Sequence, residues 1–292
     1  MNVNLQPQTL EIKDWLNNAN SQLSEIGIIS SRLDAEIILS HSLGENRTYL
    51  HAHGNKKIGD KIVQIANKKL VLRLNRIPIA YIVGYKEFYG RNFIVNKNTL
   101  IPRPESEDII NILKQILLPN TYNIKSTKLV DVGTGCGCLG ITAKLEFSNI
   151  DVTLTDISKK ALVIAKRNAK KLLANVHIIK NDLLINCIDK FDIIIANLPY
   201  VDKSWDRSPE TNYEPSLSLF ATDSGLSQIK KLIVGIKNSL NVDGYLIIEA
   251  DPVQHDSIIK LAKKQSLVKT HQNNYVVAFK LDSQKNIKYC PY

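Results

Sequence analysis

The chain has 292 residues, of which 44% are apolar, and a formal net charge of +10 at pH 7. This size and composition predict an ordinary globular protein with a full core and two domains. The first residues lack the basic and apolar regions of a signal peptide, and no run approaches the roughly 20 apolar residues that span a bilayer. We therefore expect a cytoplasmic protein, without a membrane partner, whose positive charge permits a large anionic substrate but does not require one.

The four cysteines, at positions 136, 138, 187 and 290, fit neither a disulfide framework nor a usual zinc spacing. No metal site is expected. Cys136 and Cys138 are interpreted as small residues in a crowded turn, with a redox role as the alternative.

The first part of the chain has the pattern of a helical bundle. Apolar residues alternate at steps of four and three between Ile12 and Ile26, which is a helix stripe. A second helix is predicted from the apolar residues at positions 62, 65, 66, 70 and 74. Ser31 with Asp34 predicts the start of a further helix that runs to residue 43. After Pro78, residues 80–83 and 87–95 predict a β-hairpin. We expect a helical domain at 1–76, a hairpin linker at 77–102 and a second domain at 103–292.

The second domain opens with a strand and a glycine-rich turn. Residues 128–131 form a short apolar strand, Gly133, Gly135 and Gly137 follow it, and residues 139–145 continue as a helix. Glycines there permit a tight turn and close approach of the backbone to a ligand at the helix N-terminus. This is the pattern of a nucleotide-binding turn, although such a glycine spacing alone is weak evidence.

Acidic residues follow the next two predicted strands. Asp156 ends the strand at 150–155, roughly 20 residues beyond the glycines, where a carboxylate accepts ribose hydroxyls in nucleotide-binding folds. The alternative is that Asp156 only starts a turn before Ser158 caps the next helix. Asp182 follows the strand at 176–179, beside Leu183, and is interpreted as an acceptor for the amine of an adenine ring.

Predicted strands and helices continue to alternate as far as residue 280. A helix is predicted at 158–173, and further helices and strands are predicted at 226–240, 244–249, 253–264 and 274–280. This alternation predicts an α/β domain with a parallel sheet, in which the polar residues at the strand ends gather at one edge.

The most informative motif is Asn197-Leu198-Pro199-Tyr200, which follows the apolar run 191–196. The Asn197 side-chain oxygen and the Leu198 carbonyl are two acceptors on a turn that Pro199 stiffens, and together they can hold one planar NH2 group. Tyr200 could add an aromatic wall. The motif therefore predicts methylation of an amide or amine nitrogen; a plain turn at a strand end is the alternative.

In its order of motifs the chain resembles the peptide chain release factor N5-glutamine methyltransferases, the PrmC/HemK-like family, over nearly its whole length. The shared motifs lie at 31–36, 47–53, 78–84, 86–90, 100–107, 213–215 and 225–226. The resemblance implies a helical domain that docks the release factor, a hairpin linker and a Rossmann-like domain that binds S-adenosylmethionine and releases S-adenosylhomocysteine. The substrate it implies is the Gln of the Gly-Gly-Gln loop, and we expect a monomer that does not bind nucleic acid directly.

The resemblance also implies roles for particular residues. Asn197 to Tyr200 would hold the substrate glutamine. The cofactor would be lined by residues of the glycine turn, the two acidic positions and the start of the substrate motif: Gly133, Thr134, Gly135, Cys136, Gly137, Asp156, Asp182, Leu183 and Asn197.

Two features depart from the family pattern. Leu198 stands where the family usually has proline, and the form Asn-Leu-Pro-Tyr also occurs in ribosomal RNA adenine dimethyltransferases. The residues Glu249-Ala250-Asp251 replace a segment that generally contains glycine, and they receive no role. Alternatives are therefore a methyltransferase for a ribosomal RNA adenine or a ribosomal protein glutamine, and a docking module without catalysis.

The segment around Pro104 has two interpretations. Its charged residues Arg103, Glu105 and Glu107 either fold over the cofactor or begin a helix after Pro104.

Overall fold

A computed structural model describes residues 10–119, 127–185 and 187–282. The chain divides into two compact units. The first unit contains Met1–Gly84 together with Ser208–Tyr213, and the second contains Tyr85–Arg207 and Glu214–Tyr292. The first boundary lies within the stretch 77–102 that was predicted as a linker.

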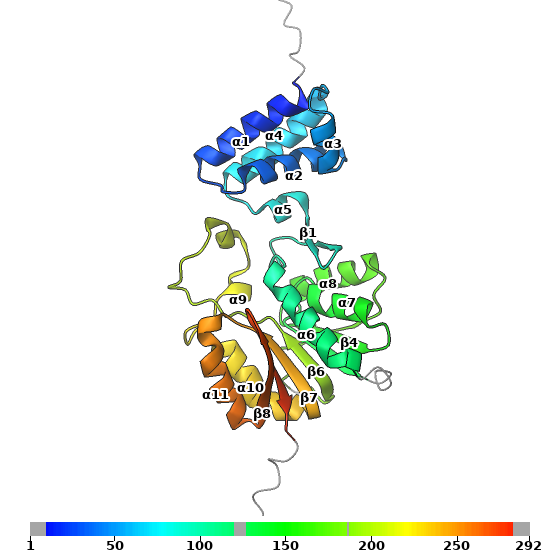
Figure 1. The fold of residues 1–292 in the computed structure, drawn as a ribbon, viewed down its shortest axis with the longest axis vertical. Helices are drawn as coiled ribbons and strands as arrows, with labels where there is room; N and C mark the ends of the chain where they lie inside the picture. The colour runs from blue at the N-terminus through cyan, green and yellow to red at the C-terminus, as the bar shows by residue number, and fades with distance from the viewer. Residues whose placement is uncertain (1–9, 120–126, 186, 283–292) are drawn as a thin grey trace, which may run out of the picture. The chain divides into compact units, whose positions relative to one another are not determined.

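The first unit is helical (Figure 1). Its helices are α1 (Ile12–Glu25), α2 (Ser31–Leu43), α3 (Arg47–Ala52), α4 (Asp60–Leu74) and α5 (Ile79–Val83). The predicted stripe of α1 is buried from Ile12 to Leu23, and Trp15 beside it donates its indole N–H to Asn67 at 2.8 Å. These side chains pack against buried residues of α2 and α4, as amphipathic helices pack around a shared core.

The predicted strand at residues 80–83 is wrong, because these residues form α5. Pro78 precedes the helix, and Gly84 ends it in the left-handed conformation with φ of 82°. A proline before and a glycine after a short segment are the ordinary boundaries of a helix. The hairpin is instead made by β1 (Tyr85–Phe88) and β2 (Arg91–Ile94), which pair antiparallel in the second unit.

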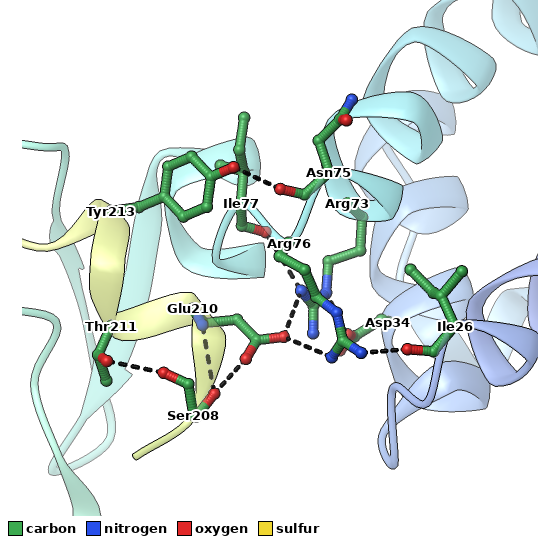
Figure 2. Close-up of polar contacts among 10 residues, drawn as sticks. All are labelled: Ile26, Asp34, Arg73, Asn75, Arg76, Ile77, Ser208, Glu210, Thr211 and Tyr213. Carbon is green, nitrogen blue, oxygen red and sulfur yellow. Dashed lines mark hydrogen bonds and ion pairs between the residues drawn. The ribbon is translucent and has the colours of Figure 1, made fainter. Parts of the chain in front are cut away.

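A buried ion pair links α2 and α4 within the first unit (Figure 2). The Arg73 Nε of α4 donates to the Asp34 carboxylate of α2 at 2.7 Å, and both side chains are almost fully buried. A second guanidinium nitrogen of Arg73 donates to Glu210 at 2.9 Å, and Arg76 lies 3.3 Å from the same carboxylate. The Tyr213 hydroxyl donates to the Asn75 carbonyl at 2.5 Å. These contacts explain why Ser208–Tyr213 belongs to the helical unit although the sequence places it far away.

The second unit is built on a seven-stranded sheet with the order β5-β4-β3-β6-β7-β9-β8. Its strands are β3 (Lys128–Val132), β4 (Asp151–Asp156), β5 (His177–Lys180), β6 (Phe191–Ala196), β7 (Leu240–Glu249), β8 (Leu267–Asn273) and β9 (Val276–Leu281). The strands β3 to β7 are parallel, while β9 runs antiparallel to β7 and β8 antiparallel to β9. The predicted Rossmann-like α/β class is confirmed, but β8 was not predicted because its lysine, threonine and histidine obscure any apolar alternation.

Helices cover both faces of this sheet (Figure 1). On one side lie α6 (Glu107–Leu117), α7 (Cys138–Glu146) and α8 (Lys159–Lys171), and on the other lie α10 (Ser227–Ser239) and α11 (His255–Lys264). The second unit also contains the short helical turns η1 (Pro104–Ser106), α9 (Ser216–Leu219) and η4 (Pro252–Gln254), whereas η3 (Pro209–Tyr213) belongs to the first unit. No helix within the described ranges is long and apolar enough to cross a membrane.

The strand order fixes where a ligand can enter. From β3 the chain proceeds outward through β4 and β5, and then returns to add β6 and β7 on the other side of β3. Such a reversal opens a crevice at the carboxyl ends of the two central strands. In the register of the sheet Val132 pairs with Ala196, and Ala196 pairs with Ile248. The glycine turn, Asn197 and Glu249 therefore follow neighbouring positions at the same edge of the sheet.

Candidate active site

A cavity lies at this crevice, and many of the predicted residues line it. They are Gly133, Thr134, Gly135, Cys136, Asp156, Asp182, Leu183, Asn197, Leu198 and Pro199. Gly137 and Tyr200 do not line it. Its wall also includes Arg103 and Ser106, which precede α6, and Phe220, which follows α9.

The glycine turn is held by hydrogen bonds from both neighbouring elements. The Thr134 N–H donates to the Thr155 carbonyl of β4 at 2.8 Å. The Thr134 hydroxyl donates to Asp131 at 2.6 Å, and Gly140 of α7 donates its N–H to the same carboxylate oxygen at 2.9 Å. Burial raises the pKa of Asp131 to about 6, against the opposing effect of these bonds. Gly137 lies at the N-terminal cap of α7 and closes the turn with an N–H bond to the Thr134 carbonyl at 2.8 Å.

The structure places Asp156 both at the start of the turn before α8 and at the wall of the cavity. One carboxylate oxygen accepts the Gly135 N–H at 2.9 Å, and the other accepts the Ser158 N–H at 2.8 Å before α8. It thus starts the turn and also lines the cavity. Burial raises its pKa, while the two N–H bonds oppose this shift. Each oxygen keeps a further lone pair for a ligand hydroxyl.

The substrate motif is ordered by residues from other parts of the fold. Asn197 donates its side-chain Nδ2 to the Ser106 Oγ at 2.9 Å, which leaves Oδ1 as the acceptor of this amide. Leu198 is 4% exposed and belongs to the apolar core that the central strands share with α10 and α11. The Tyr200 hydroxyl donates to Glu249 at 3.0 Å. Tyr200 thus anchors the turn from behind and forms no wall of the cavity.

A glycine allows the backbone of Tyr200 to be held closely. A Cβ on Gly225, whose φ is 81°, would lie 1.9 Å from the Tyr200 carbonyl oxygen. Gln254 donates from Nε2 to that carbonyl and to the Ser224 carbonyl, both at 2.8 Å. The motif at 225–226 therefore supports the Asn-Leu-Pro-Tyr turn from outside.

The segment at 100–107 is tied to the motif at 213–215. The buried Glu214 carboxylate accepts the Ile101 N–H at 3.0 Å and is ion-paired with Arg103. This pair places Arg103 at the cavity, whereas Glu105 and Glu107 do not line it. Glu107 begins α6 and accepts the Tyr89 N–H at 2.8 Å.

Sequence reasoning missed Ser106 and Glu249. Glu249 ends β7 as Asp156 ends β4, so its position at a strand end was a signal for the same edge. Burial raises the pKa of Glu249, whereas hydrogen bonds from Ser106 and Tyr200 oppose the shift. Burial, followed by the adjacent Glu249 charge, raises the pKa of the Tyr200 hydroxyl.

The structure brings no cluster of three or more His, Cys, Asp or Glu side chains into a metal-binding arrangement within residues 10–119, 127–185 and 187–282. Cys136, Cys138 and Cys187 are free thiols, and Cys290 lies outside the described residues.

Comparisons with known proteins give the same organisation. Residues 14–84 match the family model of the PrmC N-terminal domain, and residues 106–211 match that of the methyltransferase small domain. A solved methyltransferase from Pyrococcus furiosus shares the fold with a TM-score of 0.50 at 17% identity, covering 74% of this chain and 99% of that one.

Relatives that are closer in sequence carry more specific names. A bifunctional methyltransferase of Rickettsia bellii is 35% identical and covers 86% of this chain, which spans only 50% of that relative's length. A release factor glutamine methyltransferase of Francisella tularensis is 34% identical and covers 80% of this chain and 82% of its own. The predicted resemblance is confirmed, and the chain belongs to the release factor glutamine methyltransferase family.

Proposed function

We propose that this protein transfers a methyl group from S-adenosylmethionine to the side-chain amide nitrogen of the Gln in the Gly-Gly-Gln motif of peptide chain release factors. The observation that carries the proposal is the Asn197 amide, whose Nδ2 is bound to Ser106 and whose Oδ1 remains as an acceptor beside the cavity. The names of the relatives and the match of the helical unit support the substrate.

The donor set of the cavity fits S-adenosylmethionine. The glycine turn leaves room for a ligand against its backbone, because a Cβ at Gly135 would meet no atom closer than 4.0 Å. Carboxylates of Asp156 and Asp182 supply acceptors for ribose hydroxyls and for an adenine amine. Gly133, Thr134, Cys136 and Leu183 would complete the cofactor wall. When bound, this cofactor supplies an electrophilic methyl group.

The substrate side of the cavity would act by position and charge. The lone pair of an amide nitrogen is delocalised, so the nitrogen is a weak nucleophile and must be held in line. Asn197 Oδ1 and the Leu198 carbonyl would accept its two N–H groups, and their dipoles would stabilise the positive charge that grows on nitrogen. The methylated nitrogen would then lose one proton to water, which gives the neutral N-methyl amide. Alignment of the amide is expected to supply most of the rate.

The test incubates the purified chain with S-adenosylmethionine and an unmethylated release factor, followed by mass spectrometry of the Gly-Gly-Gln peptide. One added methyl on that Gln is expected. Label in ribosomal RNA or in a ribosomal protein instead would favour those alternatives. Absence of label despite cofactor binding would favour a docking module.

Two variants separate the roles within this assay. Asn197→Ala should abolish turnover and leave cofactor affinity nearly unchanged, since the acceptor it removes is the one proposed for the substrate amide, while the glycine turn, Asp156 and the rest of the cofactor wall remain. Asp156→Ala should weaken cofactor binding first, measured by calorimetry. Loss of cofactor binding in Asn197→Ala would contradict the assignment of this residue to the substrate.

A further inference from the structure

Arg103 is a cation at the cavity to which the proposed function gives no role. Its side chain is 34% exposed, and both Arg103 and Ser106 line the cavity. The Ser106 N–H donates to the Arg103 carbonyl at 3.2 Å, and the Ser106 Oγ accepts from Asn197 at 2.9 Å. Arg103 therefore lies at the end of the cavity that contains Asn197.

Both the backbone and the side chain of Arg103 are fixed by their neighbours. Pro102 and Pro104 flank the residue, and its backbone is extended, with φ of −100° and ψ of 142°, as a following proline favours. Its Nη2 donates to Oε1 of Glu214, whose side chain is 2% exposed. The other oxygen of Glu214 accepts the Ile101 N–H at 3.0 Å. The guanidinium is thus held at the cavity before any ligand binds, which lowers the entropy cost of binding.

The Arg103 guanidinium keeps most of its donors for a ligand. A guanidinium has five N–H groups in one plane, and among the described residues the hydrogen bonds of this one use Nη2 alone. Two parallel N–H groups match the two oxygens of a carboxylate, and such a charged pair is stronger than a neutral hydrogen bond. The ligand group that Arg103 fits best is therefore a carboxylate.

The proposed cofactor has one carboxylate, at the end of its methionine part. In the proposed function Asp182 holds the adenine and Asp156 the ribose, while the methyl group of the sulfonium faces the amide held by Asn197. The methionine part continues from the sulfonium, on the side away from the adenine. The Asn197 end of the cavity, where Arg103 lies, is therefore the end that receives the methionine part.

Lys231 is the other cation among the described residues that line the cavity. It is an exposed residue of α10. It lies beside Leu183, because these two residues also line a second cavity together. Since Leu183 follows Asp182, Lys231 belongs to the adenine end and leaves Arg103 as the cation for the carboxylate.

We propose that Arg103 binds the carboxylate of the methionine part of S-adenosylmethionine, and that Glu214 is a positioning residue that acts through Arg103. The inference rests on the proposed function for the identity of the cofactor, and it adds the group that holds the methionine end. A cofactor held at both ends keeps its methyl group aligned with the amide at Asn197.

The binding of two ligands to the full chain tests the proposal without turnover. S-adenosylmethionine and decarboxylated S-adenosylmethionine differ only in the carboxylate, and calorimetry gives the ratio of their affinities. Arg103→Met should weaken S-adenosylmethionine about 10- to 100-fold, as loss of a hydrogen-bonded charged contact does, and the decarboxylated ligand less than about threefold. Arg103→Lys keeps the charge without the paired N–H groups and should fall in between. Equal weakening of both ligands, or of neither, would overturn the proposal.

A second variant covers the effect of Arg103→Met on Glu214, which is left buried without its counter-charge. Arg103→Met/Glu214→Gln removes this charge, and the glutamine keeps an oxygen for the Ile101 N–H. Its preference for S-adenosylmethionine over the decarboxylated ligand should be lost as in the single variant. A retained preference would overturn the proposal.

Two further variants separate the roles of the cavity cations and of Glu214. Lys231→Met is the matched control, and its affinity ratio should stay within about twofold of the wild type. A loss as large as in Arg103→Met would show that the carboxylate is not bound by Arg103 in particular, and the proposal would fail. Glu214→Gln should lower the ratio less than Arg103→Met, and an unchanged ratio would contradict its positioning role.

The affinity ratio and the methylation of a release factor can fail separately. If Arg103→Met abolishes the preference but no release factor is methylated, only the proposed substrate is wrong. If a release factor is methylated and the preference survives in Arg103→Met, only the role of Arg103 is wrong. A wild-type chain that does not bind S-adenosylmethionine would refute both.

Discussion

Loss of the Arg73 guanidinium should lower the free energy of unfolding of the helical unit far more than loss of an exposed charge. The guanidinium is 6% exposed and lies 2.7 Å from the Asp34 carboxylate, which is 3% exposed (Figure 2). Arg73→Met leaves Asp34 buried without a counter-charge, although Glu210 keeps Arg76 as a partner. Breaking one side of a buried pair costs about 3–5 kcal/mol, so we expect a loss of this size in the free energy of unfolding.

Tryptophan fluorescence can report this unit separately. The chain has two tryptophans, and Trp15 is 2% exposed in the core of the helical unit. In a Trp205→Phe background, Trp15 alone follows unfolding in urea. With a slope of about 1–3 kcal/mol per molar urea for small domains, Arg73→Met should lower the midpoint by about 1 M or more.

The double variant Asp34→Leu/Arg73→Met is the matched control. Replacing both charges with apolar groups removes the unpaired carboxylate and is often neutral for a buried pair. Its midpoint should return most of the way to that of the parent. A shift below about 0.5 kcal/mol in Arg73→Met, typical of exposed pairs, would refute the reasoning, as would a double variant no more stable than the single.

Two further predictions concern acid stability and the support of the active-site turn. Burial opposes ionisation of Glu210, but hydrogen bonds from Ser208 and Arg73 outweigh it and lower its pKa to about 2 from 4.5. The stabilisation that ionised Glu210 gives to the helical unit is therefore complete above about pH 4.5 and is lost as the pH falls toward 2. In Glu210→Gln, the unfolding transition followed by Trp15 should lack this dependence on pH, and equal pH profiles of the variant and the parent would contradict the prediction. Gly225→Ala places a Cβ 1.9 Å from the Tyr200 carbonyl, so methylation should fall by about 100-fold with cofactor affinity retained, and unimpaired turnover would show that the turn does not need this support.

The main groups of the candidate site could be predicted because each follows a strand. Asp156 and Asn197 come directly after apolar runs, and the carboxyl ends of parallel strands meet at one edge. The same rule applied to Glu249, but without the strand order nothing in the sequence indicated that β7 lies next to β6. Ser106 precedes a helix, so no strand-end rule could identify it.

The other omissions have a different physical cause. Residues 80–83 are apolar enough for a strand, and the flanking Pro78 and Gly84 decided for a helix. The contact of Arg73 with Glu210 joins residues 137 positions apart, and neither periodicity nor turn residues mark Ser208–Tyr213 as part of the helical unit. Long-range ion pairs leave no local pattern in the sequence, so only the folded chain can reveal them.

The departure at Leu198 can be understood from the packing of the site. A proline at this position would stiffen the turn through its ring, whereas Leu198 is held by burial, at 4% exposure, in the core that contains Val132 and Ala196. Its Cδ2 atom lies 3.0 Å from where a Cβ on Gly133 would be, so the leucine occupies the space that this glycine leaves open. Because the role proposed for position 198 belongs to its backbone carbonyl, a turn fixed by side-chain packing can serve the same chemistry as one fixed by a ring. The substitution by itself therefore gives no reason to assign a different substrate.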